Sequence, residues 1–405
     1  MSARPDTHER RALLGVDLGG TKALLGLFDT VAAGGAVPRE RHRLRLSCAE
    51  FGGFDELLGR YLRQAIVDGA IREASDVAAA CVGLAGPVAG GRAKLTNLPW
   101  EVDAGRVAAA LGGAQVRLVN DFVAAAAGIE AIGATGLRTL QRGRADPGAP
   151  RLVVGAGTGL GTALIVPDAA GWRVLPGEGG HAGFAPCSEQ ELDLLRWLRR
   201  RARRAATRGT TRSEHARTRV RWEDVVSGAG IESAFRFLAE RDRRAARARP
   251  QWHGDEAHEG GDVREVQRAR DAVPRARGRW PNASEIAAAA LALGAAPAGD
   301  AHEARAVAVD ARLAAAALDG FAAAFGAFAG DAALMTLPRG GVYVAGGIGP
   351  KVFDARRTGA FLDAFADKGG HAALLRALPV SLVLEPALGM LGAAVLAARA
   401  RPAVC

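Results

Sequence analysis

The sequence has few of the residues that build disulfide frameworks and zinc sites. Its 405 residues include four cysteines, and no two of them stand at CxxC or CxxxxC spacing. This scarcity argues against both a disulfide-rich scaffold and a structural zinc site. Free thiols in a reducing compartment are the simpler interpretation, so we expect a cytoplasmic protein.

Long uncharged apolar runs are lacking as well. The first residues, MSARPDTHERRALLG, are charged and have no apolar core of the kind found in signal peptides. No charge-free apolar stretch reaches the roughly 18 residues that a membrane-spanning helix needs. The sequence therefore predicts a soluble protein without a membrane partner.

Lysine is scarce, since only four occur, and arginine supplies nearly all of the positive charge. The formal net charge is +10, and the segment 196–221 alone holds eleven arginines against one glutamate. Such a stretch can contact phosphates or nucleic acid, but a solvated basic face is the more common outcome. We do not expect a nucleic-acid partner, whose binding would show a steep dependence on salt.

Apolar residues, by contrast, are plentiful at 49%, and 405 residues exceed what one hydrophobic core usually supports. Two domains are therefore expected. Between 241 and 281 the sequence is rich in Arg, Asp, Glu, Gly and Pro and has few large apolar residues. This composition predicts a mobile or irregular insertion.

Hydrophobic periodicity and turn residues predict further strands and helices. Strands are expected at 77–88, at 340–350, where the strand ends in Gly346 and Gly347, and at 380–386. Helices are expected at 51–74, 102–111, 188–204, 284–328, 361–375 and 387–398.

A polar pair ends one apolar run, in the stretch LVNDFVAAAAG at 118–128. Asn120 and Asp121 stand where a predicted strand gives way to a predicted helix. Open α/β sheets bind their ligands at the carboxyl ends of the strands, so Asp121 is a candidate catalytic base. The alternative is a residue that caps the helix, which is the more common role of an Asp in this position.

Two glycine- and threonine-rich turns each separate a pair of apolar runs. ALLGVDLGGTKALLGLFD at 12–29 and RLVVGAGTGLGTALIV at 151–166 predict β-hairpins. The backbone N–H groups of such turns can hold a phosphate, and Asp17 can hold Mg²⁺ directly or through water. The first turn lacks the register of a P-loop and the second fails the GxGxxG fingerprint. Ordinary hairpins remain the alternative for both.

Polar side chains suited to a hydroxylated ligand occur at three further places. Glu178 and His181 stand three residues apart in PGEGGH, where they offer an acceptor and a donor or acceptor. Without a third ligand, the same pair makes a poor zinc site. Asn97 lies in the turn LTNLPW, where it can bind a ligand or form an Asx-turn. Glu223 follows the arginine-rich segment.

Five motifs occur in a fixed order between about Leu13 and Ala398: DLGGTK, NDF, GAGTGLGTA, PGEGGH and AGGI. This order resembles that of the bacterial-type glucokinases, which are actin-like sugar kinases. The resemblance implies an α/β protein of two ribonuclease-H-like domains with the active site in the cleft between them. It implies a small domain of residues 12–130 plus 386–400 and a large domain of residues 131–385.

The same resemblance implies phosphorylation of D-glucose to glucose 6-phosphate by ATP and Mg²⁺, the entry step of glycolysis, in a homodimer. Asp121 would be the general base, and Asp17 would face the magnesium ion. The hexose would be held by Asn97, Asn120, Asp121, Glu178, His181 and Glu223. The ATP would be held by Asp17, Gly19, Gly20, Thr21, Gly157, Thr158, Gly159, Gly346 and Gly347.

The sequence departs from related kinase groups in two respects. Many relatives of the repressor, open-reading-frame and kinase group carry a cysteine-rich zinc motif after the PGEGGH loop, but GFAPCSEQE has only Cys187. Zinc is therefore not expected, and the plain glucokinase branch is favoured. No DNA-binding segment precedes Leu13, which argues against a repressor. A kinase for another hexose or an amino sugar remains an alternative, and so does a non-catalytic sugar sensor.

Overall fold

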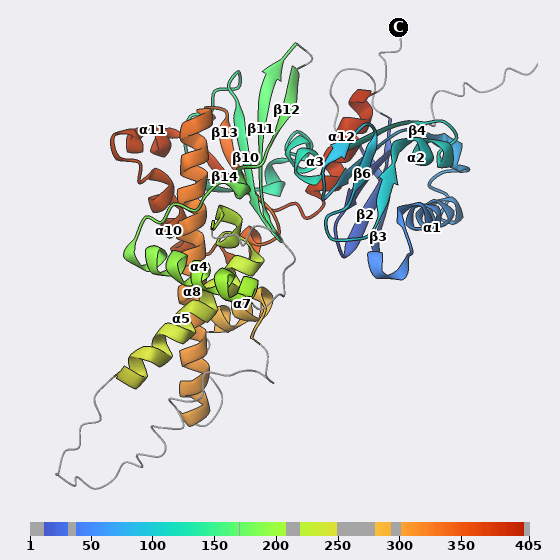
Figure 1. Cartoon of the computed structure of the whole chain (residues 1–405). Coiled ribbons are helices and arrows are strands. Elements are labelled where there is room, and N and C mark those ends of the chain that lie inside the picture. Colours follow the sequence, from blue (N-terminus) through green and yellow to red (C-terminus); the bar gives the residue numbers. More distant parts are fainter. Residues whose placement is uncertain are drawn as a thin grey trace, which may run out of the picture.

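The computed structural model of the chain describes residues 12–30, 38–169, 171–207, 219–248, 280–292 and 301–400. These residues form two lobes, each built around one large β-sheet (Figure 1). Residues 208–218 of the arginine-rich segment and residues 249–279 of the expected insertion lie outside the described part of the chain.

The sheet of the small lobe has the strand order β3-β2-β1-β4-β8. The first three strands form an antiparallel meander, and β4 and β8 continue the sheet in parallel to β1. The central strands β1 and β4 are buried along nearly their whole length, which is why both are continuous apolar runs. The strands are β1 (Ala12–Leu18), β2 (Lys22–Asp29), β3 (Glu40–Ser47), β4 (Val77–Leu84) and β8 (Gln115–Asn120).

Helices cover both faces of this sheet. One face carries α1 (Phe54–Val67) and α2 (Ala104–Ala110), and the other carries α3 (Asp121–Gly128) and α12 (Leu388–Ala400). Through α12 the chain returns from the large lobe to the small one (Figure 1). A minor sheet completes the lobe and consists of β5 (Val88–Ala89), β6 (Arg92–Lys94) and β7 (Glu101–Asp103).

The sheet of the large lobe has the strand order β12-β11-β10-β13-β14-β9. It repeats the pattern of the small lobe, because an antiparallel meander of three strands is again continued by parallel strands, here with the antiparallel β9 at the edge. This repeat confirms the expected two-domain ribonuclease-H-like fold. The strands are β9 (Leu137–Gln141), β10 (Arg151–Ala156), β11 (Leu160–Asp168), β12 (Gly171–Gly177), β13 (Gly341–Ala345) and β14 (Val380–Val383).

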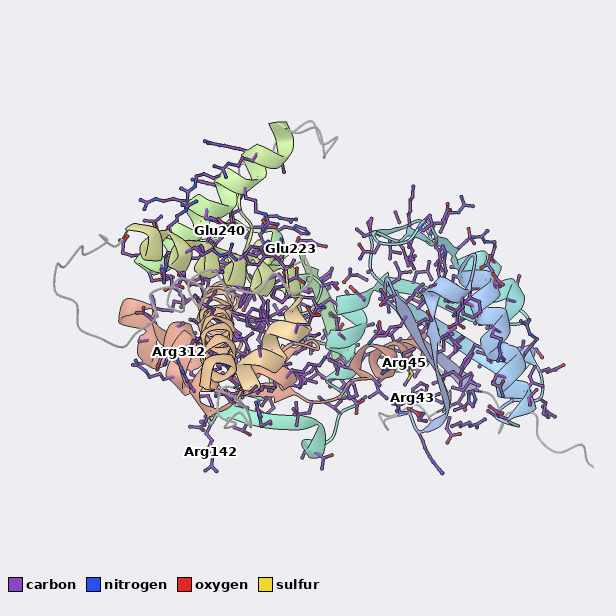
Figure 2. All side chains as sticks on the ribbon, turned by 90° about the horizontal axis from the view of Figure 1, so that it is seen from below. Arg43, Arg45, Arg142, Glu223, Glu240 and Arg312 are labelled. Carbon is purple, nitrogen blue, oxygen red and sulfur yellow. The ribbon has the colours of Figure 1, made fainter. Side chains whose placement is uncertain are left out.

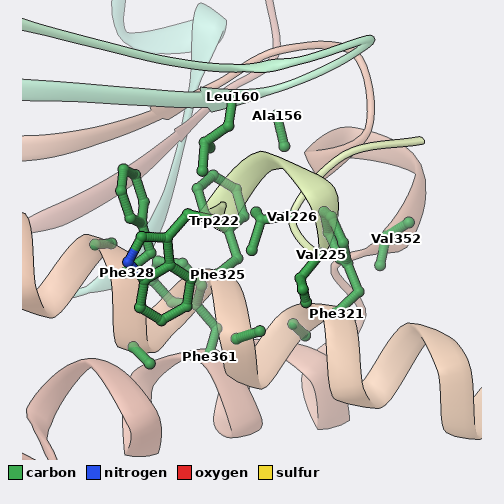
Figure 3. Close-up of a cluster of buried hydrophobic side chains, with 14 of the residues drawn as sticks. Ala156, Leu160, Trp222, Val225, Val226, Phe321, Phe325, Phe328, Val352 and Phe361 are labelled. Carbon is green, nitrogen blue, oxygen red and sulfur yellow. The ribbon is translucent and has the colours of Figure 1, made fainter. Parts of the chain in front are cut away.

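The helices of the large lobe pack around an aromatic core (Figure 3). Trp222 lies edge-on to Phe184, with ring centroids 5.0 Å apart, and 5.5 Å from Phe328. This packing fixes the backbone on either side of Trp222. The helices are α4 (Glu189–Thr207), α5 (Gly228–Ala248), α7 (Ala283–Leu291), α8 (Ala301–Thr336), α9 (Gly349–Val352), α10 (Ala355–Ala366) and α11 (Ala372–Ala377).

One helix of the described chain is long and apolar enough to cross a membrane. It is the Ala311–Thr336 part of α8, with a mean hydropathy of 1.5 over its most apolar window. Of that window, 72% is buried inside the protein, where it forms part of the aromatic core. Its apolar composition is explained by this burial.

Several expected elements have different bounds in the structure: for example, the helix expected at 51–74 is Phe54–Val67, and the strand expected at 340–350 is Gly341–Ala345. The helix expected at 361–375 is two helices, α10 and α11, because the chain turns at Gly369, whose φ of +53° favours glycine. The insertion expected from 241 was placed too early, because α5 continues to Ala248 through alanine and arginine, which are strong helix formers. The helix expected at 284–328 is α7 and α8, separated by residues 293–300, which lie outside the described part.

Phe122, on α3, packs into a hollow of the large-lobe hairpin. A Cβ atom added to Gly161 would lie 2.3 Å from Cδ2 of Phe122, and one added to Gly155 would lie 2.7 Å from its Cε2. Other residues of α3 join a hydrophobic cluster with β10 and β11. The two glycines therefore give the phenyl ring room to join the small lobe to the large lobe.

We expect Gly161→Ala to lower the free energy of unfolding by roughly 1–3 kcal/mol, because the new methyl group overlaps a rigid ring. Gly157→Ala is the matched control, since a Cβ there meets nothing within 4 Å. Urea unfolding of both variants measures the difference. Equal stabilities of the two variants would show that the ring moves away at no cost.

Candidate active site

The two glycine- and threonine-rich hairpins predicted from the sequence meet at one cavity between the lobes. The cavity has a volume of about 390 Å³. The small lobe contributes the turn between β1 and β2, and the large lobe contributes the turn between β10 and β11. The lining residues are Asp17, Gly19, Gly20, Thr21, Lys22, Leu24, Arg45, Asn97, Thr158 and Pro386.

Both turns are narrow. The Gly19 N–H donates to the carbonyl oxygen of Lys22 at 3.0 Å, and the Gly157 N–H donates to that of Gly159 at 2.9 Å. A Cβ atom on Gly20 would lie 2.8 Å from Cβ of Asn97, so this glycine lets Asn97 approach the first turn. Asn97, predicted as a hexose ligand, thus lies at the wall of the cavity that contains the first turn.

Gly346 and Gly347 follow β13 on the large lobe and do not line this cavity. Gly346 has a φ of +91°, and a Cβ there would lie 2.3 Å from the carbonyl oxygen of Ala156. Glycine is therefore required at this position by the backbone itself. At Gly347 a Cβ would meet nothing within 4 Å, which leaves open space beside the strand end.

Asp17 is a half-buried carboxylate near the end of β1. Burial, followed by the charge of Asp121, raises the pKa of Asp17 to about 6, although Lys22 acts in the opposite direction. The wall behind it is α12, where a Cβ on Gly389 would lie 2.8 Å from the Asp17 carboxylate. A single carboxylate beside a phosphate-sized cavity suits Mg²⁺, which binds proteins through one or two carboxylates plus substrate phosphates.

Asp121 is the first residue of α3, but the helix is capped by its neighbour. The Oδ1 atom of Asn120 accepts a hydrogen bond from the Phe122 N–H at 2.9 Å, and Oδ1 of Asp121 accepts from the same group at 2.8 Å. Among the described residues, Oδ2 of Asp121 has no hydrogen-bond donor, so it is available to a ligand. Burial, with the charge of Glu178 as a smaller cause, raises the pKa of Asp121.

Glu178, His181 and Glu223 form a second group of polar side chains. Two backbone hydrogen bonds join their segments: Phe184 N–H to Val220 at 2.9 Å and Trp222 N–H to Ala182 at 3.0 Å. As a result, His181 lies 3.6 Å from Glu178 through Nε2 and 3.6 Å from Glu223 through Nδ1. Figure 2 labels Glu223 on the side of the large lobe that faces the small lobe.

Two arginines that the sequence analysis did not predict also lie at the site, one at the cavity and one beside the polar group of Glu178, His181 and Glu223. Arg45 lines the cavity from β3, and Arg221 bonds to Glu223 at 2.7 Å. Arg221 is the last of the eleven arginines in segment 196–221, so nothing in its composition distinguishes it. Arg45 is placed there by the strand register, because β3 pairs with β2 and sets Arg45 opposite Leu24, which itself pairs with Asp17.

Within the described residues, no group of three or more His, Cys, Asp or Glu side chains is arranged to hold a metal ion. The charge of Asp121 raises the pKa of Asp17, and the charge of Glu178 raises the pKa of Asp121. This arrangement, on two ribonuclease-H-like lobes, defines a kinase that transfers phosphate to a sugar hydroxyl.

Comparison with known proteins identifies the family within this class. The family model described as Glucokinase matches residues 14–400, so the chain belongs to the glucokinase family. A glucokinase of Nostoc sp. is 36% identical over 387 residues, which cover 96% of this chain and 99% of the relative. The family resemblance inferred from the five ordered motifs is thereby confirmed.

Solved structures show the same fold. A glucokinase from an Antarctic psychrotroph superposes with a TM-score of 0.69 at 24% identity, over 96% of this chain and 99% of the other. A glucokinase from Streptomyces griseus, solved in complex with glucose and AMPPNP, superposes with a TM-score of 0.52 at 21% identity over 96% and 99%.

Proposed function

We propose that the protein transfers the γ-phosphoryl group of ATP to the 6-hydroxyl of D-glucose. The position of Asp121 carries this proposal. It lies near enough to Asp17, beside the phosphate-sized cavity, for its charge to raise the pKa of Asp17, and near enough to Glu178 for its own pKa to be raised. A sugar hydroxyl bound between Asp17 and Glu178 would therefore lie near the carboxylate of Asp121, the proposed base.

In the proposed mechanism, Oδ2 of Asp121 accepts the proton of the attacking hydroxyl. A buried carboxylate with a raised pKa is a better base than an exposed one, because its pKa lies closer to the working pH. Asn120 orients the start of α3 through its Oδ1 and keeps its amide group for the hexose. Glu178, His181 and Glu223 bind other hydroxyls of the ring, and Asn97 approaches it from the small lobe.

The phosphates of ATP would occupy the cavity between the two hairpins. Gly19, Gly20 and Thr21 hold them from the small lobe, and Gly157, Thr158 and Gly159 hold them from the large lobe. Gly346 and Gly347 border the adenosine. Asp17 would hold Mg²⁺, directly or through water, and the ion would offset phosphate charge.

Two cations line the cavity, and they balance the charge that remains on magnesium ATP. The charge of Lys22 lowers the pKa of Asp17, whereas Arg45 has no ion-pair partner among the described residues. Arg43, two residues away on β3, bonds to Glu40 at 2.5 Å. Figure 2 shows the two arginines next to each other on the small lobe.

We expect Arg45→Gln to raise the KM for MgATP by about tenfold or more, because a charge-assisted hydrogen bond to phosphate is lost. The KM for glucose should stay the same. Arg43→Gln is the matched control and should leave both constants unchanged. Steady-state kinetics at saturating cosubstrate measures the effect. A KM for MgATP that is equal in the two variants would remove Arg45 from the phosphate site.

The substrate assignment is tested by ADP formation across a panel of sugars. Glucose should have the highest kcat/KM among glucose, mannose, fructose and N-acetylglucosamine. A site that hydrogen-bonds each hydroxyl penalises a sugar that leaves one partner unpaired. A higher kcat/KM for another sugar would favour the alternative, a kinase for that hexose or amino sugar on the same fold.

We also propose that the enzyme works in the cytoplasm as a homodimer.

A further inference from the structure

Arg221 contacts three side chains at once: Asp224 and the two predicted hexose ligands Glu223 and His181. Its Nη2 and Nε atoms bond to the two carboxylate oxygens of Asp224 at 2.7 Å and 3.3 Å. Its Nη1 atom lies 2.7 Å from Oε1 of Glu223 and 3.0 Å from Nδ1 of His181. Asp224 therefore holds the guanidinium from behind, and Nη1 points toward the two predicted hexose ligands.

The contact with His181 determines where the imidazole carries its proton. A guanidinium has five N–H donors and no acceptor, so Nδ1 of His181 must be the acceptor of this hydrogen bond. A neutral imidazole that accepts at Nδ1 carries its proton on Nε2. The Nε2 atom is the one that lies 3.6 Å from Glu178.

We propose that Arg221 is a positioning residue that fixes the Nε2–H tautomer of His181 and the orientation of Glu223. The inference rests on the proposed role of Glu178, His181 and Glu223 in hexose binding. It adds a definite hydrogen-bond pattern to that role: Glu178 accepts, His181 donates through Nε2, and Glu223 accepts. A sugar hydroxyl can accept from His181 and donate to a neighbouring carboxylate, so each group orients the other.

Without Arg221 the pattern changes. Glu223 already lies 3.6 Å from Nδ1 of His181, and its carboxylate would be the nearest hydrogen-bond partner of that nitrogen. A carboxylate only accepts, so Nδ1 would then carry a proton and donate it. The imidazole would compete with the sugar for Glu223, and Glu223 would lose the donor that holds it in place.

The test compares Arg221→Gln with Arg219→Gln, which removes a positive charge from the same segment but leaves the contacts of Arg221. The ¹⁵N resonances of His181 report which nitrogen carries the proton, without any need for substrate. We expect Nδ1 to be unprotonated in the wild-type protein and in Arg219→Gln, and protonated in Arg221→Gln. We also expect Arg221→Gln to raise the KM for glucose about tenfold, with the KM for MgATP equal to that of Arg219→Gln.

A second variant covers the case in which Arg221→Gln fails to fold. Asp224→Asn weakens the anchor and leaves the guanidinium in place, so its KM for glucose should lie between those of the wild type and Arg221→Gln, with a mixture of His181 tautomers. Unprotonated Nδ1 and an unchanged KM for glucose in Arg221→Gln, or in Asp224→Asn if only that variant folds, would overturn the inference.

His181→Ala separates this inference from the proposed hexose site. If His181→Ala raises the KM for glucose and Arg221→Gln changes neither that KM nor the tautomer of His181, the hexose site stands and the positioning role of Arg221 is wrong. If neither variant changes the KM for glucose, the hexose site itself is wrong.

Discussion

Asp121→Asn should bind glucose with nearly normal affinity and lose turnover by about 10²–10⁴-fold, the usual cost of removing a general base. The fold should not suffer, because Asn120 caps the helix by accepting from the Phe122 N–H at 2.9 Å, and the Oδ1 atom of an amide at position 121 can still accept from the same group. An amide at position 121 still fills the same space but does not accept the hydroxyl proton. Single-turnover kinetics, together with calorimetric titration of glucose, separates the loss of chemistry from a loss of binding.

A matched control for Asp121→Asn is Glu178→Gln, which changes a carboxylate on the other side of the hexose position. Glu178 is 81% exposed and has no proposed part in proton transfer, so its variant should raise the KM for glucose with less effect on kcat. The two variants should thus show opposite patterns. Turnover close to wild type in Asp121→Asn would assign the base to another residue.

The fold was predictable because the pattern of apolar residues follows the strands closely. Burial on both faces makes β1 and β4 continuous apolar runs, and the two Gly-Thr turns mark the hairpins that begin each sheet. The bounds of α5 and α10 were less accurate. Arginine and alanine suit both a solvated loop and an exposed helix, and only the surrounding structure decides between them.

The candidate site was predictable where a motif combines glycine with a functional side chain. Asp17 lies at the end of the strand before one such turn, Thr158 lies in the other turn, and both line the cavity. Arg221 lies next to His181 only because a β-bridge pairs Gly183 with Arg221, which brings together side chains 40 positions apart in the sequence, and no local pattern indicates that pairing. The same holds for Phe122, whose role depends on the hollow above Gly155 and Gly161.

Asp17→Asn should make the protein without ligands more stable at neutral pH while it disables the phosphate site. Burial raises the pKa of Asp17 to about 6 from 3.8, so the folded protein binds this proton more tightly than the unfolded chain does. The contribution of Asp17 to stability is then most favourable below pH 4 and is lost as the pH rises from 4 through 6, at a cost of about 3 kcal/mol for roughly two pKa units. Asparagine carries no charge and avoids this cost at every pH.

Urea unfolding at several pH values measures this prediction. The gain in stability of Asp17→Asn should be about 2–3 kcal/mol at pH 7.5 and should vanish near pH 4. Asp103→Asn is the control of opposite sign, because Asp103 caps α2 and hydrogen bonds from Arg106, Arg92 and Gly105 lower its pKa.

The activity of Asp17→Asn is the second part of the prediction. Its kcat/KM for MgATP should fall by about 10²-fold or more, since the expected magnesium ligand is gone. A pH-independent stability difference between Asp17→Asn and wild type would mean that Asp17 is solvated in the folded protein. A stabilised but inactive variant would show that the charge of Asp17 is retained at the expense of stability because the phosphate site requires it.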